Sequence, residues 1–260
     1  MSSRLHQIGY TVVDIATPIA ELSCWEGGQA RAEIAEYAVR HNLTYIPVKE
    51  EGRITGIITR DALVNGADPW HLTSDWLIAS DTPILELIEL FADRSDRVFL
   101  MLQASRVAGL VAPADLNKIP SRATVYLLIA QFEAELARLI RRMLPDDSDM
   151  QACLSDDRWQ KLMDEKSRAA EKDIEMDLLH YMHIYDLVLI ARQNDDVRQL
   201  LGFATTSQAR KALDFQSLRN RVSHPTRPLI TARSELAKLN ETCRRLVELN
   251  QRIEQATIQT

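Results

Sequence analysis

The sequence contains few cysteines and has no long apolar run. Its three cysteines, Cys24, Cys153 and Cys243, are far apart, odd in number and without a CxxC or Cys/His ligand spacing. They predict reduced thiols in or near cores, not a disulfide framework or a zinc site. Residues 1–20 lack the basic start and apolar run of a signal peptide, and the later apolar stretches are too short to cross a membrane. We therefore expect a cytoplasmic protein with no membrane partner.

Several motifs of common enzyme classes are also missing. The chain has no glycine-rich phosphate loop, paired-carboxylate metal motif or nucleophile elbow, so nothing in it supports the enzyme classes that use them. His180, His183 and Asp186 follow one another at intervals of three residues, a spacing that could bind a metal on one helical face. No fourth ligand has a suggestive spacing nearby. We expect these side chains to form hydrogen bonds at the edge of a core, with no metal required.

The negative charge of the chain is unevenly distributed. A length of 260 residues suits two domains, and the net charge is −6. Residues 1–120 contain 10 basic and 16 acidic side chains, whereas residues 121–260 contain 21 of each. Specific binding of duplex DNA needs a broad positive face, so we exclude it. A local RNA-binding groove in the second half stays possible.

The first half predicts two copies of one α/β unit, each with a helix, a strand, a turn, a strand and a short helix. The first copy spans 29–42, 44–48, 50–53, 54–59 and 60–65, and the second spans 84–92, 97–102, 103–106, 107–111 and 113–118. Gly56 and Gly109 align at an offset of 53 residues, which marks an internal repeat. Residues 22–28 receive no assignment.

The amino-acid sequences of the two copies resemble a pair of CBS (cystathionine-β-synthase) motifs over residues 8 to 119. The first copy reads LTYIPVKEEGRITGIITRDAL, and the second, weaker copy reads RVFLMLQASRVAGLVAPADL. The resemblance implies a disc with clefts for adenine nucleotides such as AMP, ADP or ATP. In that family, backbone beside the first strand meets the base, a Ser or Thr after the glycine lies near the phosphates, and an Asp holds the ribose.

Both copies depart from the family pattern. Thr59 is in place in the first copy, but Asp61 comes one residue early; the second copy keeps Asp115 but has Ala112 instead of Ser or Thr. Each cleft of such a pair borrows from both motifs. The resemblance therefore implies one adenine-nucleotide site from the residues Tyr45, Ile46, Thr59, Asp61 and Asp115. The alternative is that Thr59 and Asp61 cap the helix that they begin and that Asp115 is solvated surface.

The second half predicts an all-α bundle after a junction at Pro120 and Ser121, so the expected domains are 1–120 and 121–260. Ser121 is the expected N-cap of the first helix. The predicted helices are 121–143, 156–172, the strongly apolar 174–191, a short helix from Asp195 with Gly202 as its C-cap, 206–222, and a final helix from Thr231. Five or six helices of this kind make one bundle.

One close group of Arg, Asn and His lies in residues 218–225. Pro225 disfavours helical geometry at His224, so the helix from Thr206 is expected to stop there and let the chain bring His224 back toward Arg219. Histidine moves protons near neutral pH, arginine binds phosphate through two parallel hydrogen bonds, and an amide such as Asn220 orients either. Together they suit attack of a ribose 2′-hydroxyl on its neighbouring phosphodiester without a metal. The alternative is an ordinary Ser-His-Pro exit turn.

The same segment is locally basic. Between Ser207 and Arg233 there is one acid, Asp214, and there are six basic residues: Arg210, Lys211, Arg219, Arg221, Arg227 and Arg233. A polyanion would be drawn to this segment rather than to the acidic remainder of the chain.

Arg219, a polar residue, three more residues and His224, late in an all-helical domain, resemble the signature of HEPN domains over residues 121 to 258. In that family, two copies form a metal-independent endoribonuclease site at a dimer interface. The resemblance implies that Arg219 and His224 are catalytic, that Asn220 is their polar companion, and that the partners are a second copy of the chain and single-stranded RNA.

The leading hypothesis is an α/β CBS pair fused to an all-α, HEPN-like bundle that acts as an adenine-nucleotide-regulated, metal-independent endoribonuclease. A nucleotide could switch cleavage if it bound one dimer arrangement better than another. The main alternative is a non-catalytic nucleotide sensor whose bundle is a dimerisation, RNA-binding or partner-docking module. A nucleotidyl-transfer or toxin–antitoxin role rests only on the proteins with which the HEPN family is known to occur.

Overall fold

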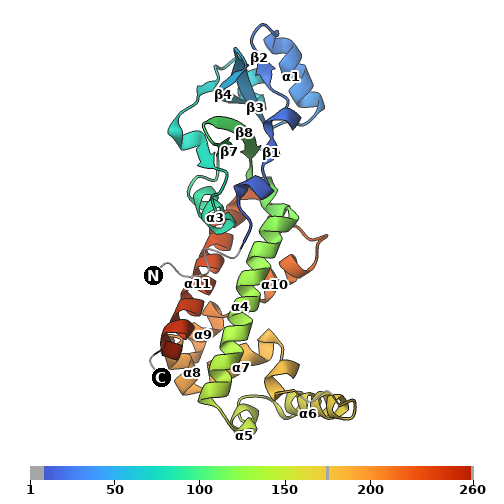
Figure 1. The fold of residues 1–260 in the computed structure, drawn as a ribbon, viewed down its shortest axis with the longest axis vertical. Helices are drawn as coiled ribbons and strands as arrows, with labels where there is room; N and C mark the ends of the chain where they lie inside the picture. Colours follow the sequence, from blue (N-terminus) through green and yellow to red (C-terminus); the bar gives the residue numbers. More distant parts are fainter. Residues whose placement is uncertain (1–8, 174–175, 259–260) are drawn as a thin grey trace. The chain divides into compact units, whose positions relative to one another are not determined.

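The computed structural model describes residues 9–173 and 176–258 (Figure 1). These residues form two compact units. The strand unit contains Gly9–Arg122 and Ile230–Asn240, and the helical unit contains Ala123–Leu229 and the C-terminal residues from Glu241. The boundary expected from the sequence, after residue 120, assigns Ile230–Asn240 to the helical domain. The structure instead packs this segment with the strand unit.

The first sheet of the strand unit has the order β2-β3-β4-β5. Its strands are Trp25–Glu26, Tyr45–Glu50, Arg53–Thr59 and Trp70–His71, with helix α1 (Arg31–Arg40) before β3 and helix α2 (Arg60–Val64) after β4. The predicted hairpin of β3 and β4 turns at Glu51 and Gly52, whose φ angles of 47° and 78° give the turn the twist that a hairpin needs. The hairpin and both helices share a core: Ala38, Ile46, Val48, Ile58 and Leu63.

The second sheet repeats this pattern in the order β1-β8-β7-β6. Its strands in that order are Thr17–Pro18, Arg106–Val111, Phe99–Gln103 and Leu77–Ala79, with helix α3 (Ile84–Asp93) before β7 and the 3-10 helix η5 (Pro113–Asn117) after β8. In each sheet a parallel pair leads into an antiparallel hairpin and then into an antiparallel edge strand. Both hairpins have an irregular register at the same place, after Val48 and after Met101. The prediction of a duplicated α/β unit is therefore confirmed.

The repeated glycines, Gly56 and Gly109, have the same structural role. Each lies on the second strand of its hairpin, opposite the edge strand. A Cβ atom would lie 2.5 Å from the Trp70 carbonyl oxygen at Gly56 and 2.7 Å from the Thr17 carbonyl oxygen at Gly109. Glycine is required because the backbone of the edge strand approaches too closely for any side chain.

A second core joins the two sheets. It consists of Ile57 from the first sheet, Leu100 and Leu110 from the second sheet, and the nearby Trp76 and Val98. Tyr45 packs against this core at its margin. The remaining short elements of the strand unit are the 3-10 helices Val12–Asp14, Ile19–Glu21, Ser74–Trp76 and η7 (Arg233–Glu235).

The described residues of the helical unit form α-helices and a 3-10 helix. They are α4 (Ile119–Met143), α5 (Asp147–Gln151), α6 (Asp156–Ala170), η6 (Leu178–Tyr181), α7 (Ile184–Gln193), α8 (Asp195–Leu200), α9 (Thr206–Ala212), α10 (Gln216–Ser223) and α11 (Leu236–Ile258). The first residues of α4 and of α11 belong to the strand unit, and the remainder of each helix belongs to the helical unit.

The two long helices bury the apolar stripes that their sequences predict. The buried side chains of α4 include Val125, Ile129, Phe132, Leu136 and Leu139, and the buried apolar side chains of α11 include Leu236, Leu239, Cys243, Leu246, Leu249 and Ile253. The ring of Phe132 meets that of Phe215 edge to face, with 5.4 Å between the ring centroids. Burial raises the pKa of the Cys243 thiol to about 12, so this cysteine is protonated at neutral pH.

Several predicted helix bounds are wrong. The predicted helix 174–191 begins at Ile184, because the Asp186 carboxylate accepts the His183 N–H at 2.9 Å and starts a new helix. The predicted helix 206–222 is divided into α9 and α10 by residues 213–215, where Leu213 and Phe215 turn into the core. Ser121 is a buried residue inside α4, not its N-cap.

One predicted helix start is wrong, and one predicted helix end is confirmed. The final helix begins at Leu236 after η7, not at Thr231. Gly202 ends α8 as predicted, with a φ angle of 85° and an N–H donated to the Gln199 carbonyl at 2.8 Å. Ile8 and Ile174, at which two predicted ranges begin, lie outside the described residues.

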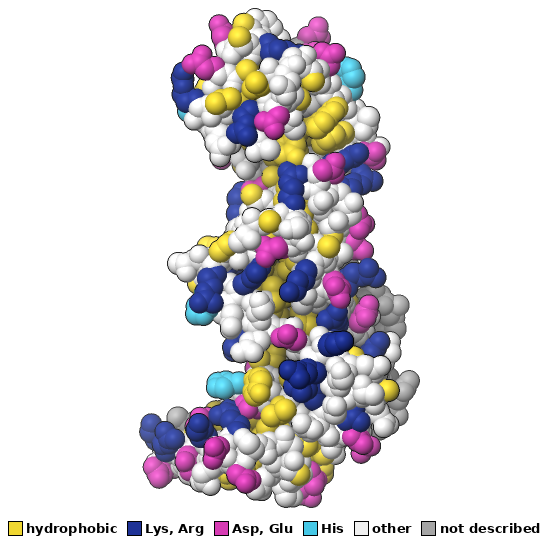
Figure 2. Space-filling model, turned by 180° about the vertical axis from the view of Figure 1, so that it is seen from behind, with side chains coloured by type: hydrophobic (Ala, Val, Ile, Leu, Met, Phe, Trp, Pro, Cys, Tyr) yellow, Lys and Arg dark blue, Asp and Glu magenta, His cyan; other side chains and the backbone are white. Residues whose placement is uncertain are grey.

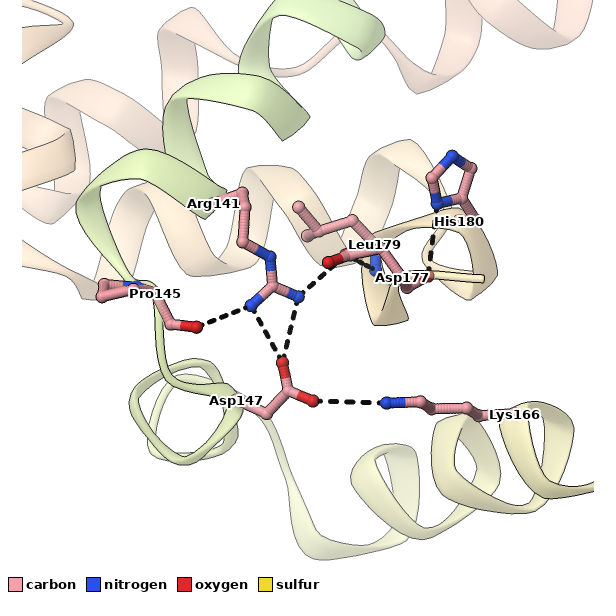
Figure 3. A network of polar contacts seen from close by, with 7 residues as sticks. All are labelled: Arg141, Pro145, Asp147, Lys166, Asp177, Leu179 and His180. Atoms are coloured by element: carbon pink, nitrogen blue, oxygen red, sulfur yellow. Dashed lines mark hydrogen bonds and ion pairs between the residues drawn. The ribbon is translucent and has the colours of Figure 1, made fainter. Parts of the chain in front are cut away.

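A polar network links α4, α5, α6 and η6 at one end of the helical unit (Figure 3). The Arg141 guanidinium donates to the Asp177 carboxylate at 2.8 Å, to Asp147 at 3.0 Å and to the Pro145 carbonyl at 2.9 Å. Burial alone would raise the pKa of Asp177, but the hydrogen bonds from Arg141 and from the Leu179 N–H outweigh burial and lower it. The network therefore holds Asp177 in its charged form.

Asp186 pairs with an arginine of a neighbouring helix. Arg158 of α6 donates to both of its carboxylate oxygens, at 2.8 Å and 2.7 Å, and Asp186 is 1% exposed. Within residues 9–173 and 176–258, no cluster of three His, Cys, Asp or Glu side chains could hold a metal ion. The three cysteines are free thiols, of which Cys24 and Cys153 are half-buried.

The surface carries charges of both signs. On the face drawn in Figure 2, Lys and Arg side chains alternate with Asp and Glu side chains over both units, and no broad positive area is visible. Among the described helices, none combines the length and the apolar character that a membrane crossing requires.

Candidate functional site

The first candidate site is at the end of the hairpin in the first sheet. Tyr45 begins β3, Thr59 ends β4, and the two residues are register partners. The Tyr45 hydroxyl donates to the Asp96 carbonyl oxygen at 2.7 Å. The hairpin end of the first motif copy is thus tied to the loop that precedes β7 of the second copy.

Arg233 completes this site from a distant part of the chain. Its guanidinium carbon lies 5.7 Å from the centre of the Tyr45 ring, a cation–π distance. Its nitrogen atoms donate to the Tyr45 hydroxyl at 2.7 Å and to the Ser95 carbonyl at 2.6 Å. Both acceptors are neutral oxygen atoms, so the positive charge of Arg233 remains available to an anion.

Asn117 fixes the segment that carries Arg233. The Asn117 amide nitrogen donates to the Ile230 carbonyl at 3.1 Å, and its amide oxygen accepts the Ile230 N–H at 3.0 Å. This paired contact joins the last residue of η5 to the start of Ile230–Asn240. The Tyr45 site therefore combines residues from both motif copies and from the C-terminal segment.

The other predicted nucleotide-binding residues are placed unequally. The Thr59 hydroxyl caps α2 by accepting the Ala62 N–H at 3.2 Å, which is the capping role that the sequence left open as an alternative. Asp61 is highly exposed and lies 3.5 Å from Arg60. The Ile46 side chain is buried in the core of the first sheet, so its backbone alone can reach a ligand.

Asp115 is not a freely solvated side chain. Its carboxylate accepts the Ala112 N–H at 2.7 Å and pairs with Lys118 at 2.8 Å, and 14% of the side chain is exposed. Lys118 also donates to the Ile15 carbonyl at 2.5 Å. Asp115 lies inside η5 and accepts the N–H of the N-cap residue Ala112, which aligns with Thr59 at the offset of 53 residues.

The second candidate site surrounds α10. This helix ends at Ser223, and His224 has an extended backbone with φ −111° and ψ 100°, so the predicted stop before Pro225 is confirmed. The His224 carbonyl accepts the Arg227 N–H at 2.9 Å, which closes a turn over Pro225. Arg221 donates to the Leu229 carbonyl at 3.1 Å and holds the chain beyond this turn.

A hollow of about 690 Å³ adjoins α10 within the helical unit. Its polar lining includes Arg219 and Asn220 of α10, Arg192 of α7 and Arg210 of α9. His224 is exposed and lies outside the lining of this hollow. The structure therefore brings together two of the three predicted catalytic residues in one hollow.

The sequence did not reveal where Arg192, Arg210 and Arg233 lie. The count of basic residues between Ser207 and Arg233 included two of them, but it could not say which face they occupy. Arg192 lies outside that segment and carries no motif. Its position in the hollow depends on the packing of α7 beside α9.

Comparisons with known proteins give structural matches. No protein-family model matches the chain, and no curated protein matches it. A structure of CBSX2 in complex with AMP is 17% identical, with a TM-score of 0.38, and the match covers 46% of this chain and 98% of that one. The CBS domain of a bacterial CNNM/CorC family Mg²⁺ transporter in complex with ATP is 18% identical, with a TM-score of 0.37, over 44% of this chain and 87% of that one.

A structure of the CBS-pair protein CBSX2 from Arabidopsis thaliana is 17% identical, with a TM-score of 0.36, over 46% of this chain and 96% of that chain. All three of these structures are of CBS domains or of a CBS-pair protein.

Proposed function

We propose that the strand unit binds an adenine nucleotide as a regulatory ligand. The observation that carries this proposal is Arg233, whose guanidinium lies over the Tyr45 ring and donates to neutral oxygen atoms. A phosphate is a stronger partner for a guanidinium than a neutral oxygen, because it is charged and can accept two parallel hydrogen bonds. A nucleotide that reaches Tyr45 therefore gains a charged partner in Arg233.

The roles of the other residues are assigned from the hydrogen-bonding groups that each has left for a ligand. The Thr59 hydroxyl accepts the Ala62 N–H, so its own O–H can donate to a phosphate oxygen. The Tyr45 ring and the Ile46 backbone are assigned to the base, and Asp115 to the ribose, as in the resemblance. Asp61 is the weakest member, because its exposed carboxylate lies beside Arg60. AMP and ATP, the ligands named for two similar structures, are the first to test.

Calorimetric titration with adenosine, AMP and ATP tests the proposal. Arg233→Ala is expected to weaken AMP and ATP about tenfold, the effect of losing one charge-assisted hydrogen bond, and to leave adenosine within about twofold. Arg106→Ala, which removes an exposed arginine from the second hairpin, is the matched control. An equal loss for adenosine and AMP would remove Arg233 from the phosphate site, and no binding of any nucleotide by the wild-type protein would reject the site itself.

A second candidate function is metal-independent cleavage of single-stranded RNA by Arg219, Asn220 and His224. Two observations favour it: α10 ends immediately before His224, and Arg219 and Asn220 line one hollow. His224 would take the proton of a ribose 2′-hydroxyl as that oxygen bonds to the neighbouring phosphorus, and Arg219 would stabilise the charge on the phosphate oxygens. The bond from phosphorus to the 5′-oxygen would break, and this oxygen would leave with a proton from solvent, giving a cyclic phosphate and a 5′-hydroxyl. The proposal includes a homodimer that completes the site with a second copy.

Cleavage is tested with mixed-sequence single-stranded RNA in EDTA, with and without AMP or ATP. The expected products end in a cyclic phosphate, and Arg219→Ala and His224→Ala should each abolish them while light scattering still reports a dimer. Equal cutting by both variants and the wild type would discard the assignment. If the wild-type protein binds nucleotide but does not cut RNA, the helical unit is a dimerisation or docking module.

A further inference from the structure

The hollow between α7, α9 and α10 gathers three arginine side chains. Arg192, Arg210 and Arg219 line it, and Asp214 is the acidic residue in its lining. Within the part of the chain that the structure describes, none of these three guanidinium groups donates to a carboxylate. The Arg192 Nε atom is buried and has no hydrogen-bond partner there.

Three other arginines of the same unit are paired with carboxylates. Arg141 binds Asp147 and Asp177, Arg158 binds Asp186, and Arg198 contacts Asp195 at 2.8 Å. Arg192, Arg210 and Arg219 give the hollow three positive charges against the one negative charge of Asp214. The hollow therefore has an excess of positive charge. A phosphate group has the opposite charge and accepts the paired hydrogen bonds that a guanidinium donates.

The remaining walls suit an aromatic base. Apolar side chains of α7 and of the link between α9 and α10, including Ile184, Leu189 and Phe215, line the hollow. Tyr185 also lines it and is 61% exposed, which leaves its ring free for stacking. A volume of about 690 Å³ is within the range of small-molecule sites.

We propose that this hollow binds one nucleotide unit, with its phosphate among Arg192, Arg210 and Arg219 and its base on Tyr185. The unit comes either from a single-stranded RNA or from a free nucleotide, because both present the same phosphate and base. This inference deepens the second candidate function, since Arg219 is shared, but it concerns binding and holds whether or not the chain cuts RNA.

The test uses the full chain and a fluorescent single-stranded 2′-O-methyl RNA of about ten nucleotides. This strand has no free 2′-hydroxyl to attack, so anisotropy measures binding without cleavage. Arg192→Ala and Arg210→Ala are each expected to weaken binding about tenfold. Each should also lower the slope of log Kd against log salt by at most about 0.7, the value for the complete loss of one phosphate contact on a single strand, because three arginines share the phosphate. Tyr185→Ala is expected to weaken binding with the slope unchanged.

The controls separate the hollow from general attraction of the strand. Arg244→Ala removes an exposed arginine from α11 and should leave both the affinity and the slope unchanged. Arg192→Lys keeps the charge and should recover part of the loss, which distinguishes a phosphate contact from a folding defect. If Arg244→Ala weakens binding as much as Arg192→Ala, or if all variants equal the wild type, the proposal is overturned.

Competition with AMP identifies the source of the nucleotide. If AMP displaces the labelled strand from the wild-type protein and Arg192→Ala weakens that displacement, the hollow takes a free nucleotide. If AMP does not displace the strand, and the arginine variants still bind the strand more weakly than the wild type, the hollow takes a unit of an RNA strand. Absence of RNA cleavage in the earlier experiment affects neither result.

Discussion

At the residue scale, two glycines carry the duplication of the strand unit. Gly56 and Gly109 each allow an edge strand to approach at a distance where a Cβ atom would touch a carbonyl oxygen. The sequence identified both glycines by their offset of 53 residues. The reason that both positions need glycine is visible only in the pairing of the edge strands. The edge strands are two residues long, too short for sequence patterns to detect.

Gly56→Ala should destabilise the protein. Its new Cβ would lie 2.5 Å from the Trp70 carbonyl, so the edge strand β5 must shift, and we expect a loss of roughly 1–3 kcal/mol in the free energy of unfolding. Urea unfolding followed by tryptophan fluorescence measures it. Gly27→Ala is the control, because its Cβ would lie 4.0 Å from the Lys49 carbonyl; we expect a change within about 0.5 kcal/mol. Equal stability of the two variants would refute the steric argument.

Arg233 contacts a residue from a distant part of the chain. Its partner Tyr45 lies 188 residues earlier in the chain. No local pattern relates two such residues, so the sequence could place Arg233 in a basic segment but not at the Tyr45 site. Thr59 is the opposite case. Its capping of α2 is a contact with the residue three positions later, and the sequence alone raised it as an alternative.

At the element scale, long periodic helices were predictable and helix ends were not. The stripes of α4 and α11 follow from the spacing of three and four residues that a buried helical face requires. The break between α9 and α10 depends on Phe215 packing against Phe132, a contact between helices far apart in sequence. The start of α7 depends on Asp186, which also binds Arg158.

The network around Arg141 should make the helical unit sensitive to acid (Figure 3). The pKa of Asp177 is lowered in the folded protein below its ordinary value of 3.8, so the unfolded chain binds its proton more readily. The resulting stability is present above pH 3.8 and is lost as the pH falls through the lower folded value. Asp177→Asn should cost about 0.5–1 kcal/mol at pH 7, since the pair is partly exposed.

The pH dependence distinguishes this charge effect from a general defect. The difference in unfolding free energy between the wild type and Asp177→Asn should be constant above about pH 5 and should shrink below pH 3.8. Glu248→Gln, an exposed change on α11, should show no such difference at any pH. A difference for Asp177→Asn that persists unchanged into acid would show that the charge of Asp177 is not the cause.

At the scale of the whole molecule, the two units are connected by more than a linker. The sequence predicted two consecutive domains, because composition and motif change near residue 120. In the structure the chain returns to the strand unit at Ile230–Asn240, and both α4 and α11 have residues in each unit. A continuous helix that serves two units transmits unfolding of one unit to the other, because its hydrogen bonds cooperate along its length.

The two units are therefore expected to unfold together. Trp25, Trp70 and Trp76 lie in the strand unit and Trp159 lies in the helical unit, so the test is made in a Trp159→Phe background, where tryptophan fluorescence reports on the strand unit and far-UV circular dichroism at the helical band reports mainly on the helical unit. Urea transitions by the two probes should coincide. Asn117→Ala, which removes both hydrogen bonds to Ile230, should move both midpoints to lower urea by the same amount, with a loss of about 1–3 kcal/mol.

Asn117→Asp refines this test, because its carboxylate still accepts the Ile230 N–H but cannot donate to the Ile230 carbonyl. Its midpoints should fall between those of Asn117→Ala and the wild type. Two separate transitions in the wild type, or an Asn117→Ala shift confined to tryptophan fluorescence, would mean that the units unfold independently. Coincident transitions would give the strand unit a physical route to the helical unit, since a ligand that stabilises Ile230–Asn240 would then stabilise α11 as well.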